Sequence, residues 1–67
     1  MVPCRVIVYP PSGSGGRRVR CDGRILGLAY SPRDVLALVR RAGLRMRLGD
    51  LYDSDLVEWR GAGPTTW

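Results

Sequence analysis

Histidine is absent from this chain of 67 residues. Its absence excludes the usual general base, the commonest metal ligand and every Ser-His or Cys-His nucleophile pair. Six acidic residues are present, but nothing in their spacing places two of them in a cleft as a general acid and base. We therefore expect no enzymatic activity and no bound cofactor.

Metal-binding motifs are missing as well. Cys4 and Cys21 do not form C-x-x-C, and without histidine no further soft ligand completes a zinc site. Asp50, Asp53 and Asp55 lack the glycine and carboxylate spacing of an EF-hand loop. We expect no metal ion, a solvated acidic loop, and two cysteines buried as small strand residues.

Long apolar runs are scarce. None approaches the ~20 residues that span a bilayer, and the N-terminus reaches Pro3 and Cys4 without the apolar run of a signal peptide. We expect a cytoplasmic protein with reduced thiols and no membrane partner.

The short length limits what the fold can do. A chain of this size forms one domain and buries only about 60% of the surface that it exposes when unfolded. Its core alone supplies roughly 3–5 kcal/mol of stability, so a partner or a second copy of the chain would add to it. We expect no deep cleft.

Lysine is also absent, so all eleven basic residues are arginine. Codon usage in a GC-rich genome explains this composition, and so does selection for guanidinium groups that bind phosphates or carboxylates. Residues 1–47 contain ten Arg and two Asp, a net charge of +8, whereas residues 48–67 contain one Arg and four acids, a net charge of −3. Such a basic body attracts polyanions, and the acidic end can also fold back over it.

Three strands are predicted in the first half of the chain. β-Branched residues favour a strand over residues 4–9, which Pro10 and Pro11 end. Residues 17–21 and 24–29 flank Asp22-Gly23, the signature of a two-residue type I′ turn. The Ser/Gly-rich residues 12–16 lack the spacing of a phosphate-binding P-loop, so we expect a flexible loop there.

The turn predicts the register of this hairpin. The expected pairs are Cys21–Arg24, Val19–Leu26 and Arg17–Leu28. The core side of the hairpin then carries Val19, Cys21, Leu26 and Leu28. The opposite side carries Arg18, Arg20, Ile25, Gly27 and Ala29, with Arg17 and Arg24 on the core side or at the margin of the hairpin.

One helix is predicted over residues 32–42. Ser31 is the expected N-cap, followed by Pro32 and by Asp34 at the third position. The apolar residues recur at helical spacing, and Gly43 fits the left-handed position that ends a helix.

The remaining segments predict one more strand. Residues 45–48 are expected to form a short strand or an extended connection, and residues 49–55 a loop. Residues 56–60 alternate like a strand, with Val57 and Trp59 on one side.

These elements predict an α+β fold. We expect a small antiparallel sheet in the order β-β-β-α-β with one helix packed across it. Residues 1–60 form the single domain, and residues 61–67 are expected to be a C-terminal tail.

Two resemblances follow from these residues. Residues 18–27, 29–31, 34, 40–44 and 57–61 resemble a group of short hypothetical proteins from high-GC actinobacteria, for which no function is known. The β-β-β-α layout resembles AP2-type and integrase-arm DNA-binding domains, which implies a sheet laid in the major groove with Arg18 and Arg20 as the matching contacts. Residues 56–67 have no counterpart in those domains.

The arginines suggest a binding role. Arg18 and Arg20 share one side of the predicted sheet, and a guanidinium group can bridge phosphates or read a guanine edge. We expect a small non-enzymatic protein that binds nucleic acid, with affinity that falls with salt. The expected contacts lie on the Arg-bearing sheet face and at the exit of the helix, and they are Arg5, Arg18, Arg20, Arg45 and Arg47.

The alternative is a protein-interaction module or adaptor. An exposed sheet edge accepts a partner strand, and Trp59 and Trp67 are candidate partner contacts because tryptophan is enriched at binding hot spots. In this alternative the sheet edge or the Trp67 tail also offers a route to a homodimer.

Overall fold

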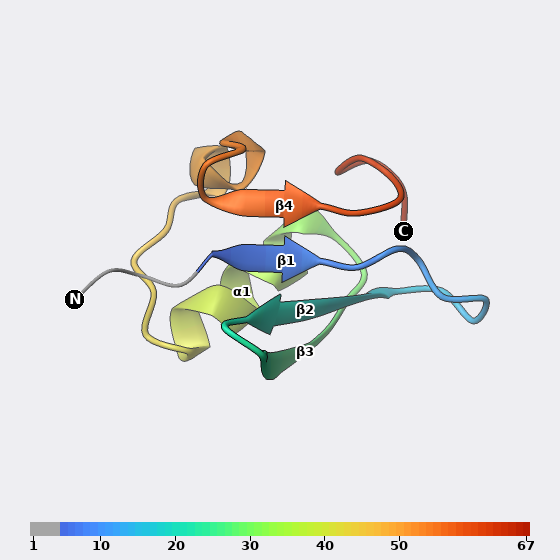
Figure 1. Cartoon of the computed structure of the whole chain (residues 1–67), viewed down its shortest axis with the longest axis horizontal. Helices are drawn as coiled ribbons and strands as arrows, with labels where there is room; N and C mark the ends of the chain where they lie inside the picture. The colour runs from blue at the N-terminus through green and yellow to red at the C-terminus, as the bar shows by residue number, and fades with distance from the viewer. Residues whose placement is uncertain (1–4) are drawn as a thin grey trace.

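A computed structural model describes residues 5–67, so Cys4 and the predicted start of the first strand lie outside the described residues. The four strands and the helix follow one another in the expected order β-β-β-α-β, and a short 3-10 helix precedes the last strand (Figure 1). The elements are β1 (Val6–Val8), β2 (Arg17–Cys21), β3 (Arg24–Ala29), α1 (Pro32–Arg41), η1 (Leu48–Tyr52) and β4 (Val57–Trp59).

The four strands form one sheet in the order β3-β2-β1-β4. β1 pairs antiparallel with β2, and β2 with β3, whereas β4 pairs parallel with β1. The α+β fold class is confirmed, but the sheet is mixed rather than wholly antiparallel. The reason is the route of the chain, which passes behind the sheet through α1 and η1 and returns at the end where β1 begins (Figure 1).

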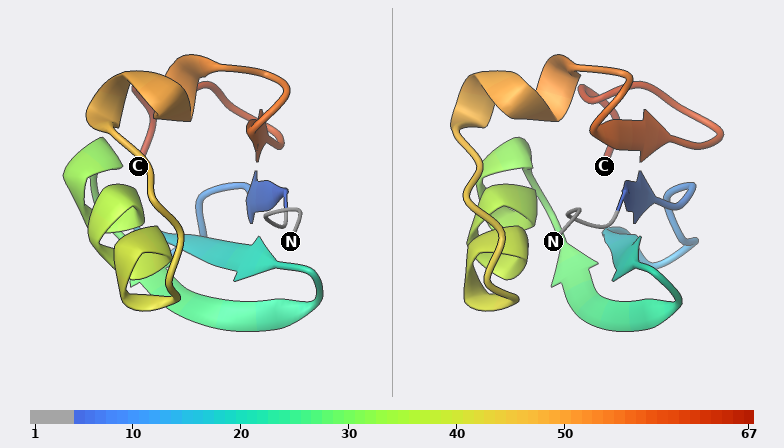
Figure 2. Two further views of the ribbon diagram at one scale, coloured as in Figure 1. Left: turned by 90° about the vertical axis from the view of Figure 1, so that its left-hand side faces the viewer. Right: turned by 60° about the vertical axis from the view of Figure 1, so that its left-hand side comes forward.

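Both helices cover the same side of the sheet (Figure 2). The buried core between these two layers consists of small and β-branched strand residues packed against α1 and η1, namely Val6, Val8, Val19, Ala29, Val35, Val39, Leu51 and Val57. No helix or strand of residues 5–67 lies over the opposite side, which we call the outer face. The sheet therefore has one face in the core and one face that no described helix or strand covers.

The predicted turn is confirmed. Asp22 and Gly23 both have positive φ, 52° and 79°, as a type I′ turn requires. The first two ladder pairs, Cys21 with Arg24 and Arg20 with Ile25, keep the expected register.

Beyond those pairs a β-bulge shifts the register by one residue. Val19 pairs with Gly27 instead of Leu26, and Arg17 pairs with Ala29 instead of Leu28. The prediction was wrong here because a bulge is a tertiary adjustment that turn chemistry does not reveal. Gly27 has a φ of 148°, and a Cβ on it would lie 2.8 Å from the Cδ2 of Leu38 in α1, so glycine lets the helix approach the bulge closely.

The bulge reverses three predicted orientations, the first of which is that of Gly27, which was expected on the side of Arg18 but faces α1. Leu28 was expected in the core but lies on the outer face opposite Arg18, with 44% of its surface exposed. Ala29 was expected outside but is fully buried. A one-residue shift has this effect because side chains alternate between the two faces of a strand.

Helix α1 has the predicted ends. The Asp34 amide donates to Ser31 Oγ at 3.2 Å, and the Asp34 carboxylate accepts from the Tyr30 amide. At the other end Gly43 has a φ of 97°, and the Leu44 amide donates to the Val39 carbonyl at 3.0 Å. These contacts form a Schellman motif that ends the helix one residue before the predicted boundary.

The segment after α1 differs in part from the expectation. Residues 45–47 form an extended connection, and η1 replaces much of the expected loop. Leu51 of η1 is fully buried, and the Asp50 carboxylate accepts from the Arg47 amide at 2.8 Å. The apolar side chain of Leu51 thus fixes this turn against the core.

Two further expectations concern the thiol of Cys21 and membrane-spanning helices. Cys21 is buried as predicted, but it does not carry a free thiol, so the expectation of a reduced thiol is wrong at this position. Among residues 5–67 there is no helix with the length and apolar character needed to cross a membrane.

Candidate functional site

The outer face gathers charged, aromatic and aliphatic side chains from all four strands. Ladder partners share a face, so the pairing of Ile7 with both Arg20 and Glu58 places these three side chains together. Arg18 likewise shares this face with Leu28, and Arg20 with Ile25. Arg5, Tyr9 and Arg60 belong to the same face, because they lie two residues from Ile7 or Glu58 and contact side chains on it. The outer face therefore consists of Arg5, Ile7, Tyr9, Arg18, Arg20, Ile25, Leu28, Glu58 and Arg60.

The charge of this face is positive. It carries four guanidinium groups, and Glu58 is the acid that the described residues place among them, which leaves a net charge of +3. The guanidinium carbons of Arg20 and Arg60 lie 5.6 and 5.4 Å from the centre of the Tyr9 ring. Tyr9 therefore holds two of the cations by cation–π contact.

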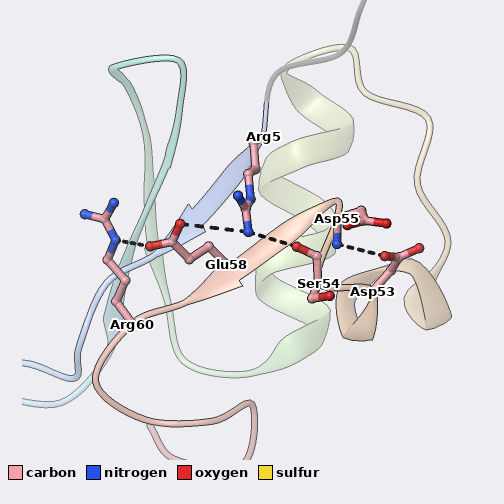
Figure 3. A network of polar contacts seen from close by, with 6 residues as sticks. All are labelled: Arg5, Asp53, Ser54, Asp55, Glu58 and Arg60. Carbon is pink, nitrogen blue, oxygen red and sulfur yellow. Dashed lines mark hydrogen bonds and ion pairs between the residues drawn. The ribbon is translucent and has the colours of Figure 1, made fainter.

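Glu58 links two of the arginines across β1 and β4 (Figure 3). Its carboxylate accepts a hydrogen bond from Arg60 Nε, and its other oxygen lies 4.0 Å from a terminal nitrogen of Arg5. Arg5 also donates to the Ser54 carbonyl at 2.9 Å. The hydrogen bond from Arg60 and the charges of Arg60 and Arg5 lower the pKa of Glu58, and the same contact raises the pKa of Arg60. Glu58 thus stays ionised and offsets part of the charge of these two arginines.

Arg18 differs from the other three cations. Its side chain is exposed, and no hydrogen bond, ion pair or ring contact joins that side chain to another described residue. Its five donors are therefore available to a ligand.

Two predicted contacts lie elsewhere. Arg45 and Arg47 are exposed in the connection between α1 and η1. This connection runs alongside the helix, where Arg40 Nε donates to the Met46 carbonyl at 3.0 Å (Figure 2). The structure thus brings Arg5, Arg18 and Arg20 onto one face and leaves Arg45 and Arg47 with the helical layer.

The most constrained arginine is Arg17, which was expected on the core side or at the margin of the hairpin. Arg17 lies on the core side of β2, and its side chain is fully buried. No carboxylate pairs with it among the described residues. Its Nε and terminal nitrogens instead donate to five backbone carbonyls, those of Tyr9, Arg60, Ala62, Gly63 and Thr66.

Trp59 and Trp67 complete the surroundings of Arg17. The Arg17 guanidinium carbon lies 5.2 Å from the Trp59 ring centre and 5.4 Å from that of Trp67. The two rings meet edge to face at 5.7 Å. Each indole N–H donates to a backbone carbonyl, Trp59 to Leu51 and Trp67 to Pro64. Burial lowers the pKa of Arg17, but an arginine in a protein remains charged, so carbonyl dipoles and ring faces balance the charge.

These contacts define the positions of the predicted partner-binding residues. Trp59 and Trp67 are both half-buried and pack against Arg17 of their own chain. Residues 61–67 fold back onto the helix side of the sheet (Figure 2). The sequence pattern that indicates the burial of Arg17 is its alternation with Val19 and Cys21, because residues two apart on a strand share a face.

The part of the chain that the structure describes contains no cluster of three or more Cys, Asp or Glu side chains that could hold a metal ion. No family model, curated protein or solved structure matches this chain.

Proposed function

We propose that this chain is a small non-enzymatic protein that binds nucleic acid through its outer face. The observation that carries the proposal is the gathering of Arg5, Arg18, Arg20 and Arg60 on a sheet face that no other helix or strand of residues 5–67 covers. Phosphates supply most of the binding free energy in nucleic-acid complexes, and guanidinium groups bind them in a planar, two-pronged geometry.

The four cations have different roles in this proposal. The Arg18 side chain is without a partner among the described residues and makes the first phosphate contact. Arg20 and Arg60 are held over Tyr9, so they lose little side-chain entropy on binding. Arg45 and Arg47 lie on the other layer and make no contact with a ligand on the outer face.

The double variant Arg18→Gln, Arg20→Gln is expected to weaken binding by about tenfold or more. The slope of log K against log salt should fall in magnitude by roughly 0.7–0.9 for each phosphate that the variant no longer neutralises. Fluorescence anisotropy with a labelled oligonucleotide, read at several salt concentrations from about 50 to 200 mM, measures both quantities.

The matched control is Arg45→Gln, Arg47→Gln, which removes the same charge from the helical layer. It should change the affinity by about twofold at most, since exposed charges beyond a Debye length are largely screened. Equal reductions of affinity in the two double variants would contradict an interface on the outer face. No binding by the unaltered protein at micromolar concentration and low salt would remove the proposed function.

Glu58→Gln is expected to act in the opposite direction. The change frees Arg5 and Arg60 from their shared acid, raises the charge of the face by one, and should tighten binding several-fold with a steeper salt slope. Because the pKa of Glu58 is lowered, its carboxylate stays charged from neutral pH down to about pH 5. The advantage of the variant should persist over that range and vanish only when the pH falls through the pKa of Glu58. Anisotropy titrations across this pH range check the result, and a variant that binds no tighter at neutral pH would contradict the role assigned to Glu58.

A protein-interaction module is the second candidate. β3 forms one edge of the sheet and carries Ile25, which is 61% exposed, and such an edge can pair with a strand of a partner or of a second copy. Sedimentation analysis distinguishes the candidates, because a monomer at all concentrations would oppose the homodimer form of this role.

A further inference from the structure

A hollow of about 380 Å³ lies on the outer face beside Arg18. Its walls come from two places, the loop between β1 and β2 and the edge strand β3. The lining residues are Ser12, Ser14, Arg18, Ile25, Gly27 and Leu28.

One wall of this hollow is aliphatic and exposed. Ile25 and Leu28 have 61% and 44% of their surfaces accessible to solvent. They share the outer face only because the bulge adds one extra residue to β3 between them, since residues three apart in a regular strand point to opposite faces. The structure thus presents two large apolar side chains next to a cation on an open surface.

The other wall is polar. Ser12 Oγ donates to the Gly15 carbonyl at 2.8 Å and lies 3.4 Å from Ser14 Oγ. The bond to Gly15 uses the Ser12 proton, so Ser14 is the donor in the contact between the two hydroxyls, and it donates to a ligand when its hydroxyl rotates away from Ser12. The guanidinium of Arg18 completes a set of donors suited to an anion.

We propose that this hollow holds one unpaired nucleotide, with its base against Ile25 and Leu28 and its phosphate on Arg18 and the Ser14 hydroxyl. The inference rests on the proposed function and narrows its ligand to single-stranded nucleic acid. In a duplex both faces of each base are stacked and its edge is paired, so a duplex presents mainly phosphate and sugar to a flat protein surface. Phosphate contacts leave Ile25 and Leu28 in water, whereas an unpaired base covers them and removes their apolar surface from solvent.

The experiment compares a labelled single strand with the duplex of the same sequence and length. The single strand is expected to bind about tenfold tighter at the same salt concentration. Ile25→Ser, Leu28→Ser should bind the single strand about tenfold more weakly, and its salt slope and duplex affinity should stay unchanged, because no charge is altered. The matched control is Leu48→Ser, which alters an exposed leucine of η1 on the helical layer and should have no effect.

A second measurement does not depend on the folding of any variant. A single strand of the same length that carries abasic sugars keeps its phosphates and should bind the unaltered protein about tenfold more weakly than the normal strand. Equal affinity for abasic and normal strands, or for duplex and single strand, would contradict the proposal that the hollow binds an unpaired nucleotide. If both forms bind equally and Arg18→Gln, Arg20→Gln weakens both, the proposed function stands and only this inference fails; if neither form binds, the proposed function fails with it.

Discussion

Arg17→Met is expected to leave most of the protein unfolded at room temperature. The substitution removes the donors of five backbone carbonyls at once, and it removes the cation that lies against both Trp59 and Trp67. Each buried carbonyl that is left without a donor costs about 1–3 kcal/mol. Two or three such groups already match the roughly 3–5 kcal/mol that the core of so small a domain supplies, so little of the stability remains.

Urea denaturation followed by tryptophan fluorescence measures this change in stability, because both indole rings contact the altered side chain. Arg18→Met is the matched control: it makes the same chemical change at the next residue, which is exposed, and should alter stability by about 0.5 kcal/mol at most. Arg17→Lys separates charge from geometry. An ammonium group has three donors and no planar face to stack, so we expect a destabilisation close to that of methionine. An unfolding midpoint for Arg17→Met equal to that of the unaltered protein would show that the five carbonyl contacts of Arg17 contribute nothing to stability.

Ending the chain at Gly61 is the second change with a large expected effect. It removes the carbonyl acceptors of Ala62, Gly63 and Thr66 and the ring of Trp67, so that Arg17 remains buried with fewer partners. The new carboxylate on Gly61 replaces part of the missing compensation. We therefore expect a destabilisation of about 2–4 kcal/mol, measured by the same urea titration.

A double-mutant cycle gives this prediction its control. If residues 62–67 stabilise the fold through Arg17, then truncating a chain that already carries Arg17→Met should cost much less than truncating the unaltered chain. Because Arg17→Met leaves little folded protein in which to measure a further loss, the cycle is measured in a stabilising osmolyte. Equal costs in the two backgrounds, or a truncated chain of full stability, would favour a segment that serves only to contact a partner.

Arg17 also connects the core to the candidate interface. It donates to the carbonyls of Tyr9 and Arg60 from the core side, while the side chains of these two residues meet on the outer face. A buried cation thus fixes the backbone under a stacked pair that the proposed function uses. Variants of Arg17 that retain some folded protein should therefore also bind nucleic acid more weakly, for an indirect reason.

The candidate site could be predicted in part. The neighbouring positions of Arg18 and Arg20 on one sheet face followed from alternation along a single strand, which is a local rule. Arg45 and Arg47, expected at the exit of the helix, lie with the helical layer, and this distance from the outer face was not predictable because the side of the sheet on which a connection lies depends on how the helix packs. The contact of Glu58 with Arg5 could not be predicted from the sequence either, since it depends on a parallel pairing between strands about fifty residues apart in the chain.

The sequence by itself determined the elements whose causes are local: the Asp22-Gly23 turn, the capped helix from Ser31 to Gly43, and the alternation in β2 and β4. These features depend on backbone dihedral preferences and on hydrogen bonds between residues a few positions apart. Only the tertiary structure decided the bulge that exposes Leu28, the parallel placement of β4 and the enclosure of Arg17 by the end of the chain. Each of these depends on contacts between distant segments, whose free energies are set by packing rather than by any local pattern of residues.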